Sequence, residues 1–329
     1  MKIIDPSHRL MYPIANPLKH IEEIGRTCYK SEDAITEISA EPFVQRLFNR
    51  GHHAMIEHFR FIVELEMYDY TPIARHIDHN KYITLTEDYR DDGEFHYVMS
   101  ASARGINDMY NAIKRDNEAN SSADRMITMT IIEDIVAVIV RHYKCAVMFD
   151  EEMVEAYQSR YSDDREYDAR VITTFGELSD YEYQMHAWYS IMFTCDRGVT
   201  HEMVRHRDAS FAQESTRYCN YSQGKHGEEI TVIRPPFWKE GSKGWNLWEA
   251  SCKLSEAGYL FLIGAGASPQ EARAVLPHST KAEIVITAQV YEWNHIFDLR
   301  VLGKTGAPHP QIKQVMEPAF NEMMEKNLL

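Results

Sequence analysis

The sequence predicts an α+β fold, because strand-like and helix-like segments occupy different parts of the chain. Residues 58–67 place apolar side chains at every second position from Phe59 to Leu65, as a half-buried strand does. Residues 188–195 (WYSIMFTC) indicate a second strand that ends at Asp196. The last third of the chain carries helix start signals. We expect the two strands to belong to one sheet, with helices packed against it.

The segment between these strands is about 120 residues long. It contains a possible strand at residues 96–101, a polar loop at residues 117–122 and a predicted helix over residues 126–149. No repeat or low-complexity tract occurs in it, and its composition does not indicate a function.

Two helices are predicted near the C-terminus. Ser268, Pro269 and Glu271 supply a cap hydroxyl, a first-turn proline and a capping carboxylate, so a helix should begin there and end near Pro277. Residues 280–283 (TKAE) repeat the capping-box pattern and should begin the next helix. On that helix, spacings of four, three and four place one set of residues on a single face: Gln289, Trp293, Ile296 and Arg300.

The composition is that of a soluble globular protein. The 329 residues include 44% hydrophobic and 11% aromatic residues, enough for a sizeable core. A formal charge of −15 argues against wrapping nucleic acid or lying on anionic lipid, because both require a cationic surface. Any anionic ligand must therefore bind in a local pocket.

The sequence also predicts a cytoplasmic protein. The N-terminus lacks a secretory signal, and residues 126–149, the most apolar stretch, contain five charged or titratable side chains that would be costly in lipid. The five cysteines are scattered and form no Cys-x-x-Cys pair, which argues against a disulfide framework or a structural zinc site. We expect reduced thiols.

Residues 205–218 (RHRDASFAQESTRY) concentrate cationic and hydroxyl side chains. The guanidiniums of Arg205, Arg207 and Arg217 suit phosphate and planar anionic heterocycles, because their donors are fixed in a plane. The alternative interpretation is a solvated helix face whose charges are balanced by nearby carboxylates. Arg273 and Arg300 favour the first interpretation, since each lies among apolar neighbours and a buried guanidinium needs an anionic partner.

A second cluster, residues 51–59 (GHHAMIEHF), invites a metal interpretation. His53 and Glu57 are four residues apart, yet their order misses both His-Glu-x-x-His and His-x-x-Glu-His by one residue. We therefore expect no metal site. His53 is expected to be structural or exposed, and His58 to be a packing residue.

Five segments together resemble one family, the flavin-dependent thymidylate synthases (ThyX). The segment 205–218 resembles the family's hallmark motif. Residues 271–277 (EARAVLP) and 293–300 (WNHIFDLR) follow at a similar spacing, residues 51–59 resemble an upstream Gly-His-x-x-x-x-Glu-His segment, and residues 26–29 resemble an early Arg-x-Ser turn. All five occur in the family's order.

The resemblance implies a ThyX-like fold: an antiparallel-rich sheet packed with helices, with a large insertion between two core strands. Residues 1–329 would form a single catalytic domain with a core of residues 1–67 and 188–318. Residues 68–187 would be an expansion of the compact family plan.

The resemblance also implies ligands and the residues that bind them. The cofactor would be flavin adenine dinucleotide (FAD), with NADPH as reductant, and the substrates deoxyuridine monophosphate (dUMP) and 5,10-methylenetetrahydrofolate. The implied FAD-binding residues are His52, Ala54, Glu57, Arg205, His206, Arg207, Gln213, Gln289 and His295. The implied dUMP-binding residues are Glu202, Arg205, Gln213, Glu214, Ser215, Thr216, Arg217, Arg273 and Arg300.

Some of these positions depart from the family's usual residues. The family often has Asn where this chain has Gln289 and His295, and a hydroxyl where it has Cys28 and Ala54. The flavin contacts expected at these positions are therefore left open.

The implied reaction is reductive methylation of dUMP to dTMP, in which Arg300 acts as the catalytic residue by stabilising negative charge on the uracil ring. No cysteine lies in a matching motif, so no covalent cysteine intermediate is expected. The resemblance further implies a homotetramer with shared active sites, and no nucleic-acid or membrane partner. Two alternatives remain open: a non-catalytic nucleotide- or flavin-binding module, and a metallohydrolase using His52, His53, Glu57 and His58.

Overall fold

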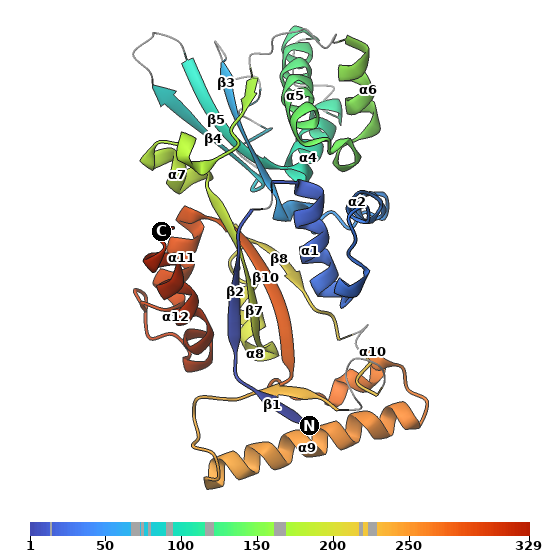
Figure 1. The fold of residues 1–329 in the computed structure, drawn as a ribbon, viewed down its shortest axis with the longest axis vertical. Helices are drawn as coiled ribbons and strands as arrows, with labels where there is room; N and C mark the ends of the chain where they lie inside the picture. Colours follow the sequence, from blue (N-terminus) through green and yellow to red (C-terminus); the bar gives the residue numbers. More distant parts are fainter. Residues whose placement is uncertain are drawn as a thin grey trace.

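Two four-stranded antiparallel sheets form the frame of the molecule, one above the other along its long axis (Figure 1). The computed structural model describes residues 1–13, 15–66, 73, 76–77, 80–89, 95–115, 122–160, 169–216, 220–222 and 229–329. The predicted class, an antiparallel-rich sheet structure packed with helices, is confirmed.

The central sheet has the order β2-β7-β10-β8. Its strands are Ser7–Met11, Trp188–Asp196, Lys281–Gln289 and Ser210–Gln213. Helices lie on both sides of it in Figure 1. On one side are α1 (Pro17–Tyr29) and α2 (Ala40–Asn49), and on the other α11 (Val290–Arg300) and α12 (Pro310–Glu325). The short helix α8 (Arg197–Met203) follows β7 directly.

The upper sheet has the order β4-β5-β3-β6. Its strands are Ile83–Tyr89, Phe95–Ser102, Arg60–Glu66 and Ala169–Val171. The helices of this region are α4 (Ala103–Arg115), α5 (Ser122–Tyr143), α6 (Glu151–Arg160) and α7 (Asp180–His186). Most of this layer therefore comes from residues 68–187, and only β3 joins it from the predicted core.

The lower layer is built around one long helix. A two-stranded parallel sheet of β1 (Lys2–Ile4) and β9 (Thr231–Ile233) lies beside α9 (Lys243–Gly264) at the bottom of Figure 1. The short helix α10 (Pro269–Ala272) follows. It begins with the predicted capping box, in which the Ser268 hydroxyl and Glu271 carboxylate are 2.6 Å apart. A 3-10 turn, Arg273–Val275, completes this segment before Pro277.

Three sequence predictions about these elements are wrong. The two predicted strands belong to different sheets, β3 to the upper and β7 to the central one. The segment after Thr280 is strand β10 and not a helix, because the Thr280 hydroxyl donates to the Pro277 carbonyl (2.6 Å) and the β-branched run that follows pairs with β7 and β8. The helix predicted over residues 126–149 ends at Tyr143 and is followed by a 3-10 turn.

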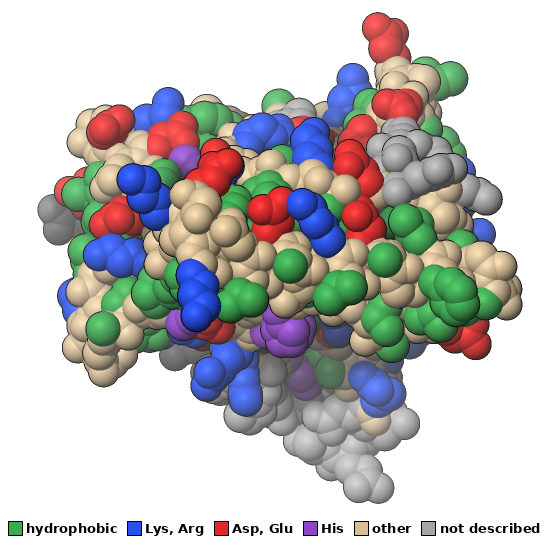
Figure 2. Space-filling view, turned by 90° about the horizontal axis from the view of Figure 1, so that it is seen from below, with side chains coloured by type: hydrophobic (Ala, Val, Ile, Leu, Met, Phe, Trp, Pro, Cys, Tyr) green, Lys and Arg blue, Asp and Glu red, His purple; other side chains and the backbone are tan. Residues whose placement is uncertain are grey.

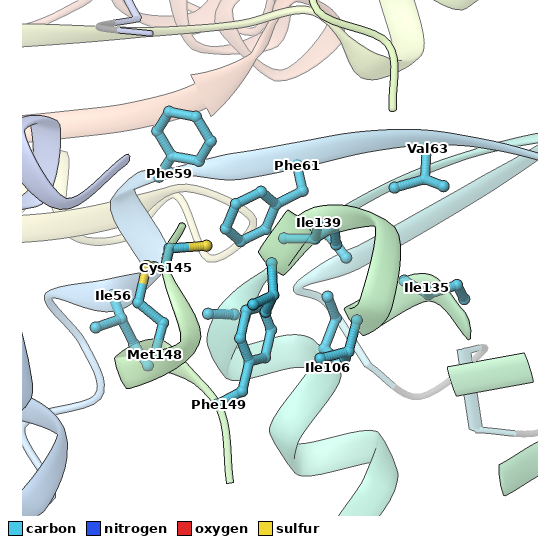
Figure 3. Packing of buried hydrophobic residues seen from close by; sticks show 14 of the residues in the cluster. Ile56, Phe59, Phe61, Val63, Ile106, Ile135, Ile139, Cys145, Met148 and Phe149 are labelled. Carbon is cyan, nitrogen blue, oxygen red and sulfur yellow. The ribbon is translucent and has the colours of Figure 1, made fainter. Parts of the chain in front are cut away.

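The two sheets are joined by buried aromatic packing. The rings of Phe59 and Trp188 lie 5.2 Å apart, and the Trp188 indole donates a hydrogen bond of 2.9 Å to the Arg60 carbonyl. Phe61 packs below them against Phe149 and residues of α4 and α5 (Figure 3). The start of β3 is thereby fixed against β7, which positions the preceding loop, residues 51–58, over the central sheet.

Candidate functional site

A first cavity of about 550 Å³ opens between α1, the loop after α2 and the end of β8. Its lining residues are Cys28, Tyr29, Gly51, His52, His53, Ala54, Met55, Arg104, Gln213 and Ser215. Four predicted site residues therefore meet here although they come from distant parts of the chain: His52, Ala54, Gln213 and Ser215. We call this space cavity 1.

Local structure explains how the loop reaches cavity 1. Gly51 adopts a φ of +70°, a left-handed conformation that glycine accepts readily, and it turns the chain at the end of α2. His52 is exposed, and its Nδ1 lies 3.1 Å from the Tyr29 hydroxyl. His53 stacks on Phe48 with ring centroids 5.2 Å apart, in agreement with its predicted structural role.

Glu57 does not line cavity 1 itself, but its ion-pair partner does. Its carboxylate is buried and forms an ion pair with Arg104, whose side chain lines the cavity. The guanidinium of Arg104 also lies over the Tyr82 ring, 4.7 Å from the centroid. The sequence prediction did not include Arg104, because it lies in the expansion and no local motif marks it. Cavity 1 thus has one cation supplied by the upper layer.

The residues at the end of β8 lie in two environments, the wall of cavity 1 and the protein interior. Gln213 donates to the Thr200 hydroxyl at 2.8 Å while lining cavity 1. Glu214 is buried, and its Oε2 lies 3.1 Å from Lys281 Nζ and accepts from the Glu283 backbone amide. Because this carboxylate is neutralised inside a charge cluster and does not line either cavity, the geometry does not support its predicted contact with dUMP.

Three further predicted nucleotide contacts have different environments. Thr216 is buried and lies 3.5 Å from Arg273 Nη1. Arg273 itself is exposed, which corrects the expectation that it is buried among apolar neighbours. It begins the 3-10 turn Arg273–Val275. Arg217 lies outside the described residues.

A second cavity of about 620 Å³ lies between α8, the segment 205–208 and α11. Its lining residues are Glu202, Arg205, His206, Arg207, Asp208, Glu292, His295, Leu299, Arg300, Thr305, Gly306, Ala307, Pro308 and His309. Six of these are predicted site residues, brought together from two motifs almost 100 positions apart. We call this space cavity 2.

Arg300 is held on one wall of cavity 2 by three hydrogen bonds. Its Nε donates to His206 Nε2 at 3.0 Å. Its Nη1 and Nη2 donate to the side chain and the backbone carbonyl of Glu202, at 3.3 and 3.2 Å. These contacts use the planar fork of the guanidinium and fix its orientation.

The hydrogen bond from Arg300 determines which ring nitrogen of His206 carries the proton. Since an arginine Nε can only donate, Nε2 of His206 must be the unprotonated acceptor, and the ring proton must lie on Nδ1. That nitrogen is 3.7 Å from Glu292 Oε1. Burial, followed by the charge of Arg300, lowers the pKa of His206 to about 4. His206 is therefore a neutral imidazole between a carboxyl group and a guanidinium.

Glu292 is a cavity residue that the sequence prediction missed. It is buried on the first turn of α11, next to Trp293 of the predicted motif. Burial, followed by the charge of Asp208, raises the pKa of Glu292 to about 7. A carboxyl group that changes charge near neutral pH beside His206 is typical of functional sites.

Arg205 and Arg207 supply the free positive charge of cavity 2. Both side chains are exposed, and neither makes an ion pair within the described part of the chain. Two guanidiniums without carboxylate partners on the rim of a cavity suit an anionic group such as a phosphate. The alternative of a charge-balanced helix face does not apply, because residues 204–209 form turns between α8 and β8.

Gln289 lies in the interior and lines neither cavity. Its amide nitrogen lies within hydrogen-bond distance of three oxygens: Thr84 Oγ1 at 3.0 Å, Ser100 Oγ at 2.9 Å and the Met185 carbonyl at 2.6 Å. Gln289 caps α11 instead of belonging to it, so the predicted helix face is reduced to three residues, of which Trp293 and Ile296 are fully buried. The geometry does not support the predicted flavin contact of Gln289, whereas His295 is exposed at cavity 2.

The four residues of the alternative metal cluster do not converge. His52 faces Tyr29, His53 stacks on Phe48, and Glu57 pairs with Arg104. His58 is buried at the end of a 3-10 turn, and its Nδ1 is 2.6 Å from the Thr287 hydroxyl. Within the described ranges, no three metal-binding side chains form a group. The structure therefore places these four side chains in separate environments.

The cysteines in the described ranges, Cys28, Cys145, Cys195 and Cys252, are buried free thiols. Burial raises the pKa of Cys28 and of Cys145 to about 12, and raises the pKa of Cys195 and Cys252 as well. A thiol with a raised pKa is a poor nucleophile. Cys28 lines cavity 1, but its environment does not favour the thiolate.

No helix in the described residues is long and apolar enough to cross a membrane.

Comparisons with known proteins place these motifs in a family. Residues 133–327 match the family model described as thymidylate synthase complementing protein. The flavin-dependent thymidylate synthase of Pyrococcus horikoshii is 32% identical over 154 residues, which cover 46% of this chain and 61% of that protein. Its Pyrococcus furiosus counterpart is 29% identical over 133 residues, which cover 40% of this chain and 52% of that protein.

The chain thus spans between about half and three-fifths of the length of these relatives. A crystal structure of the UMP/dUMP methylase PolB from Streptomyces cacaoi, bound with 5-Br dUMP, is 13% identical. It covers 100% of this chain, which covers 93% of that structure, with a TM-score of 0.39.

Proposed function

Because this chain belongs to the thymidylate synthase complementing protein family, we propose that it is a flavin-dependent thymidylate synthase, a methyltransferase that converts dUMP to dTMP. The observation that carries the proposal is the convergence at cavity 2. Arg300, His206 and Glu202 form one hydrogen-bonded unit there, beside the free guanidiniums of Arg205 and Arg207.

The donor sets of the two cavities fit the proposed ligands. Cavity 2 offers unpaired guanidiniums for a phosphate or diphosphate group. Cavity 1 combines Tyr29, His52 and Met55 with the cation of Arg104, which suits a planar ring with a polar edge. Both volumes lie within the range of ordinary ligand sites. FAD and dUMP would be held by these residues, with NADPH as reductant and methylenetetrahydrofolate as carbon donor.

Arg300 is the proposed catalytic residue. When bound and reduced, the flavin supplies a hydride. The part played by this chain is to hold a guanidinium in a fixed plane where negative charge develops on the pyrimidine. Such a preorganised donor is worth about 3–4 kcal/mol of transition-state stabilisation. His206, as a neutral acceptor, orients Arg300 without repelling it.

We also propose a homotetramer with shared active sites, in the cytoplasm. Cavities 1 and 2 have no lining residue in common. A site that needs Gln213 and Ser215 from one cavity and Arg300 from the other would be completed where two subunits meet. The free thiols of the described cysteines are compatible with a reducing compartment.

The experiment that tests the proposed function is spectroscopic. The purified protein should show a flavin absorbance that bleaches with NADPH. It should recover, with formation of dTMP, only when dUMP and methylenetetrahydrofolate are both added. A flavin that is reduced but never reoxidised by the two substrates would indicate a non-catalytic binding module. Preparations that bind no FAD would refute the proposal.

A further inference from the structure

The helix α9 is apolar on two opposite faces. One face holds Trp245, Cys252 and Tyr259, which recur every seven residues and are buried against the rest of the lower layer. A surface helix normally buries one apolar stripe and presents polar residues on the other side. α9 departs from this pattern, which indicates that its second face also has a partner.

The opposite face carries an exposed apolar stripe. Leu247, Leu254 and Phe261 also recur every seven residues, and they are 62%, 75% and 77% exposed. The residues that follow each of them by three positions are small and exposed: Ala250, Ala257 and Gly264. The two sets occupy the a and d positions of three consecutive heptads, which is the seam of a two-helix coiled coil. Figure 2 shows this end of the molecule, with hydrophobic side chains spread across it.

Hydrogen bonds and an ion pair hold α9 against the rest of the lower layer. The Met1 ammonium group lies 2.9 Å from Glu256 Oε1, which also accepts from the Ile230 backbone amide at 2.9 Å. On the other flank, the Trp248 indole donates to the Ser279 hydroxyl at 2.9 Å. Because α9 is already ordered by these bonds, little conformational entropy would be lost when a partner covers the exposed face.

The side-chain sizes are self-complementary in one orientation. We propose that α9 packs antiparallel against α9 of a second copy of this chain, around a two-fold axis between residues 255 and 256. In this register, Leu247 faces Gly264 of the second copy, Leu254 faces Ala257, and Phe261 faces Ala250. Every large side chain then meets a small one, and the contact is isologous, as a symmetric dimer requires.

A parallel helix pair and a lipid surface fit the exposed stripe of α9 less well than an antiparallel pair does. In a parallel pair, Leu254 would face Leu254 and Ala257 would face Ala257, so large residues would meet large ones and small residues would meet small ones. A lipid-binding helix needs a cationic polar face. The charges beside the stripe are instead mixed, since Lys253 pairs with Glu249 at 2.5 Å and the whole chain has a formal charge of −15.

The proposal is tested by the mass of the full-length protein in solution, measured by light scattering. Leu254→Glu places a charge next to the two-fold axis, and we expect the mass of the assembly to fall by half. The matched control is Ile38→Glu, which makes the same kind of change at another exposed residue (86%) outside α9 and should keep the wild-type mass. Circular dichroism should show the same helix content in all three proteins.

A charge pair tests the register. Leu254→Lys should dissociate the assembly, and the double variant Leu254→Lys/Ala257→Glu should restore it, because each lysine would then face a glutamate of the other copy. A wild-type mass in Leu254→Glu would overturn the proposal. A monomeric wild type that sediments with phosphatidylcholine and phosphatidylserine vesicles would also overturn it. Failure of the double variant to associate would overturn the antiparallel register. None of these outcomes depends on thymidylate synthesis.

Discussion

At the scale of single residues, the main finding is a chain of contacts from Glu292 through His206 to Arg300. The Arg300 guanidinium determines the tautomer of the His206 imidazole, and the Nδ1 atom of that ring lies 3.7 Å from Glu292 Oε1. Cavity 2 therefore holds a permanently charged donor beside a carboxyl group whose pKa is raised to about 7. The charge of this wall should change with pH while its geometry is retained.

Arg300 should matter more for turnover than for cofactor binding. We expect Arg300→Ala to retain FAD and to lose about 100-fold or more in turnover, the usual effect of removing one such donor. Arg300→Lys should lie in between, because lysine keeps the charge but cannot make the forked contacts to His206 and Glu202. The measurement is single-turnover oxidation of pre-reduced flavin by dUMP and methylenetetrahydrofolate. Wild-type rates in Arg300→Ala would make this residue structural.

Arg205 and Arg207 should contribute binding energy. Because neither has an ion-pair partner among the described residues, Arg205→Ala or Arg207→Ala should weaken FAD binding by roughly tenfold, the order expected for one charge-assisted hydrogen bond. Flavin occupancy after purification, measured by absorbance, reports the change. Arg46→Ala, at another exposed arginine on α2, is the control and should bind FAD normally. Full occupancy in both cavity variants would contradict the assignment.

Glu292 should make the stability depend on pH. Its pKa is about 7 in the folded protein and 4.5 ordinarily, so the folded state keeps a proton that the unfolded chain releases. This contribution to the free energy of unfolding is present below pH 4.5 and is lost as the pH rises through 7. His206, with its lowered pKa, contributes with the opposite sign.

The comparison with Glu292→Gln isolates this effect, because both proteins contain His206. Urea unfolding at pH 5 and at pH 8 should show that the wild type loses stability relative to the variant as the pH rises. The same pH dependence in both proteins would mean that Glu292 titrates normally.

At the scale of elements, strand β10 of the central sheet also contacts the residue that precedes the upper sheet. It pairs with β7 and β8, and its Thr287 hydroxyl lies 2.6 Å from both Ser190 Oγ and His58 Nδ1. His58 stands immediately before β3 of the upper sheet, so this buried polar group ties the start of one sheet to the middle of the other. Sequence periodicity gave no indication of this connection.

Removing the Thr287 hydroxyl should destabilise the fold. Thr287→Val keeps the shape but leaves Ser190 and His58 without this partner, and we expect a loss of about 1–3 kcal/mol in the free energy of unfolding. Thr287→Ser retains the hydroxyl and serves as the control. Denaturant titration of the three proteins measures the difference. Equal stability of the valine variant and the wild type would show that the group is dispensable.

At the scale of the whole molecule, the predicted site residues are divided between two cavities of an elongated chain. This division gives the proposal of shared active sites a direct test. Ser215→Ala changes cavity 1 and Arg300→Ala changes cavity 2, so each variant alone should have low activity. Co-expressed subunits should regain roughly a quarter of the wild-type turnover, because random assembly brings two intact half-sites together about one time in four. Mixed oligomers without any recovered activity would favour sites contained within one subunit.

Local patterns along the chain were enough to recognise the family and part of the site chemistry. The resemblance of the segment 205–218 is supported by the family match over residues 133–327. The strand predicted at residues 58–67 is found at Arg60–Glu66, the strand predicted at residues 188–195 is found at Trp188–Asp196, and the capping box at Ser268 is present. All of these depend on side chains within a few positions of one another, which is why periodicity and capping rules reach them.

Which of these segments meet depends on contacts between residues far apart in the chain. Thr280 resembles a helix cap, but the strand pairing of β10 with β7 and β8 prevails over that local signal. Arg104 joins Glu57 at cavity 1, and Glu214 turns into a charge cluster with Lys281, through contacts between positions 47 and 67 residues apart. Burial and ion pairing depend on such distant partners, whereas a motif records only neighbours along the chain. For this reason the sequence could name Arg205, Arg207 and Arg300 but could neither find Arg104 nor say which cavity each arginine lines.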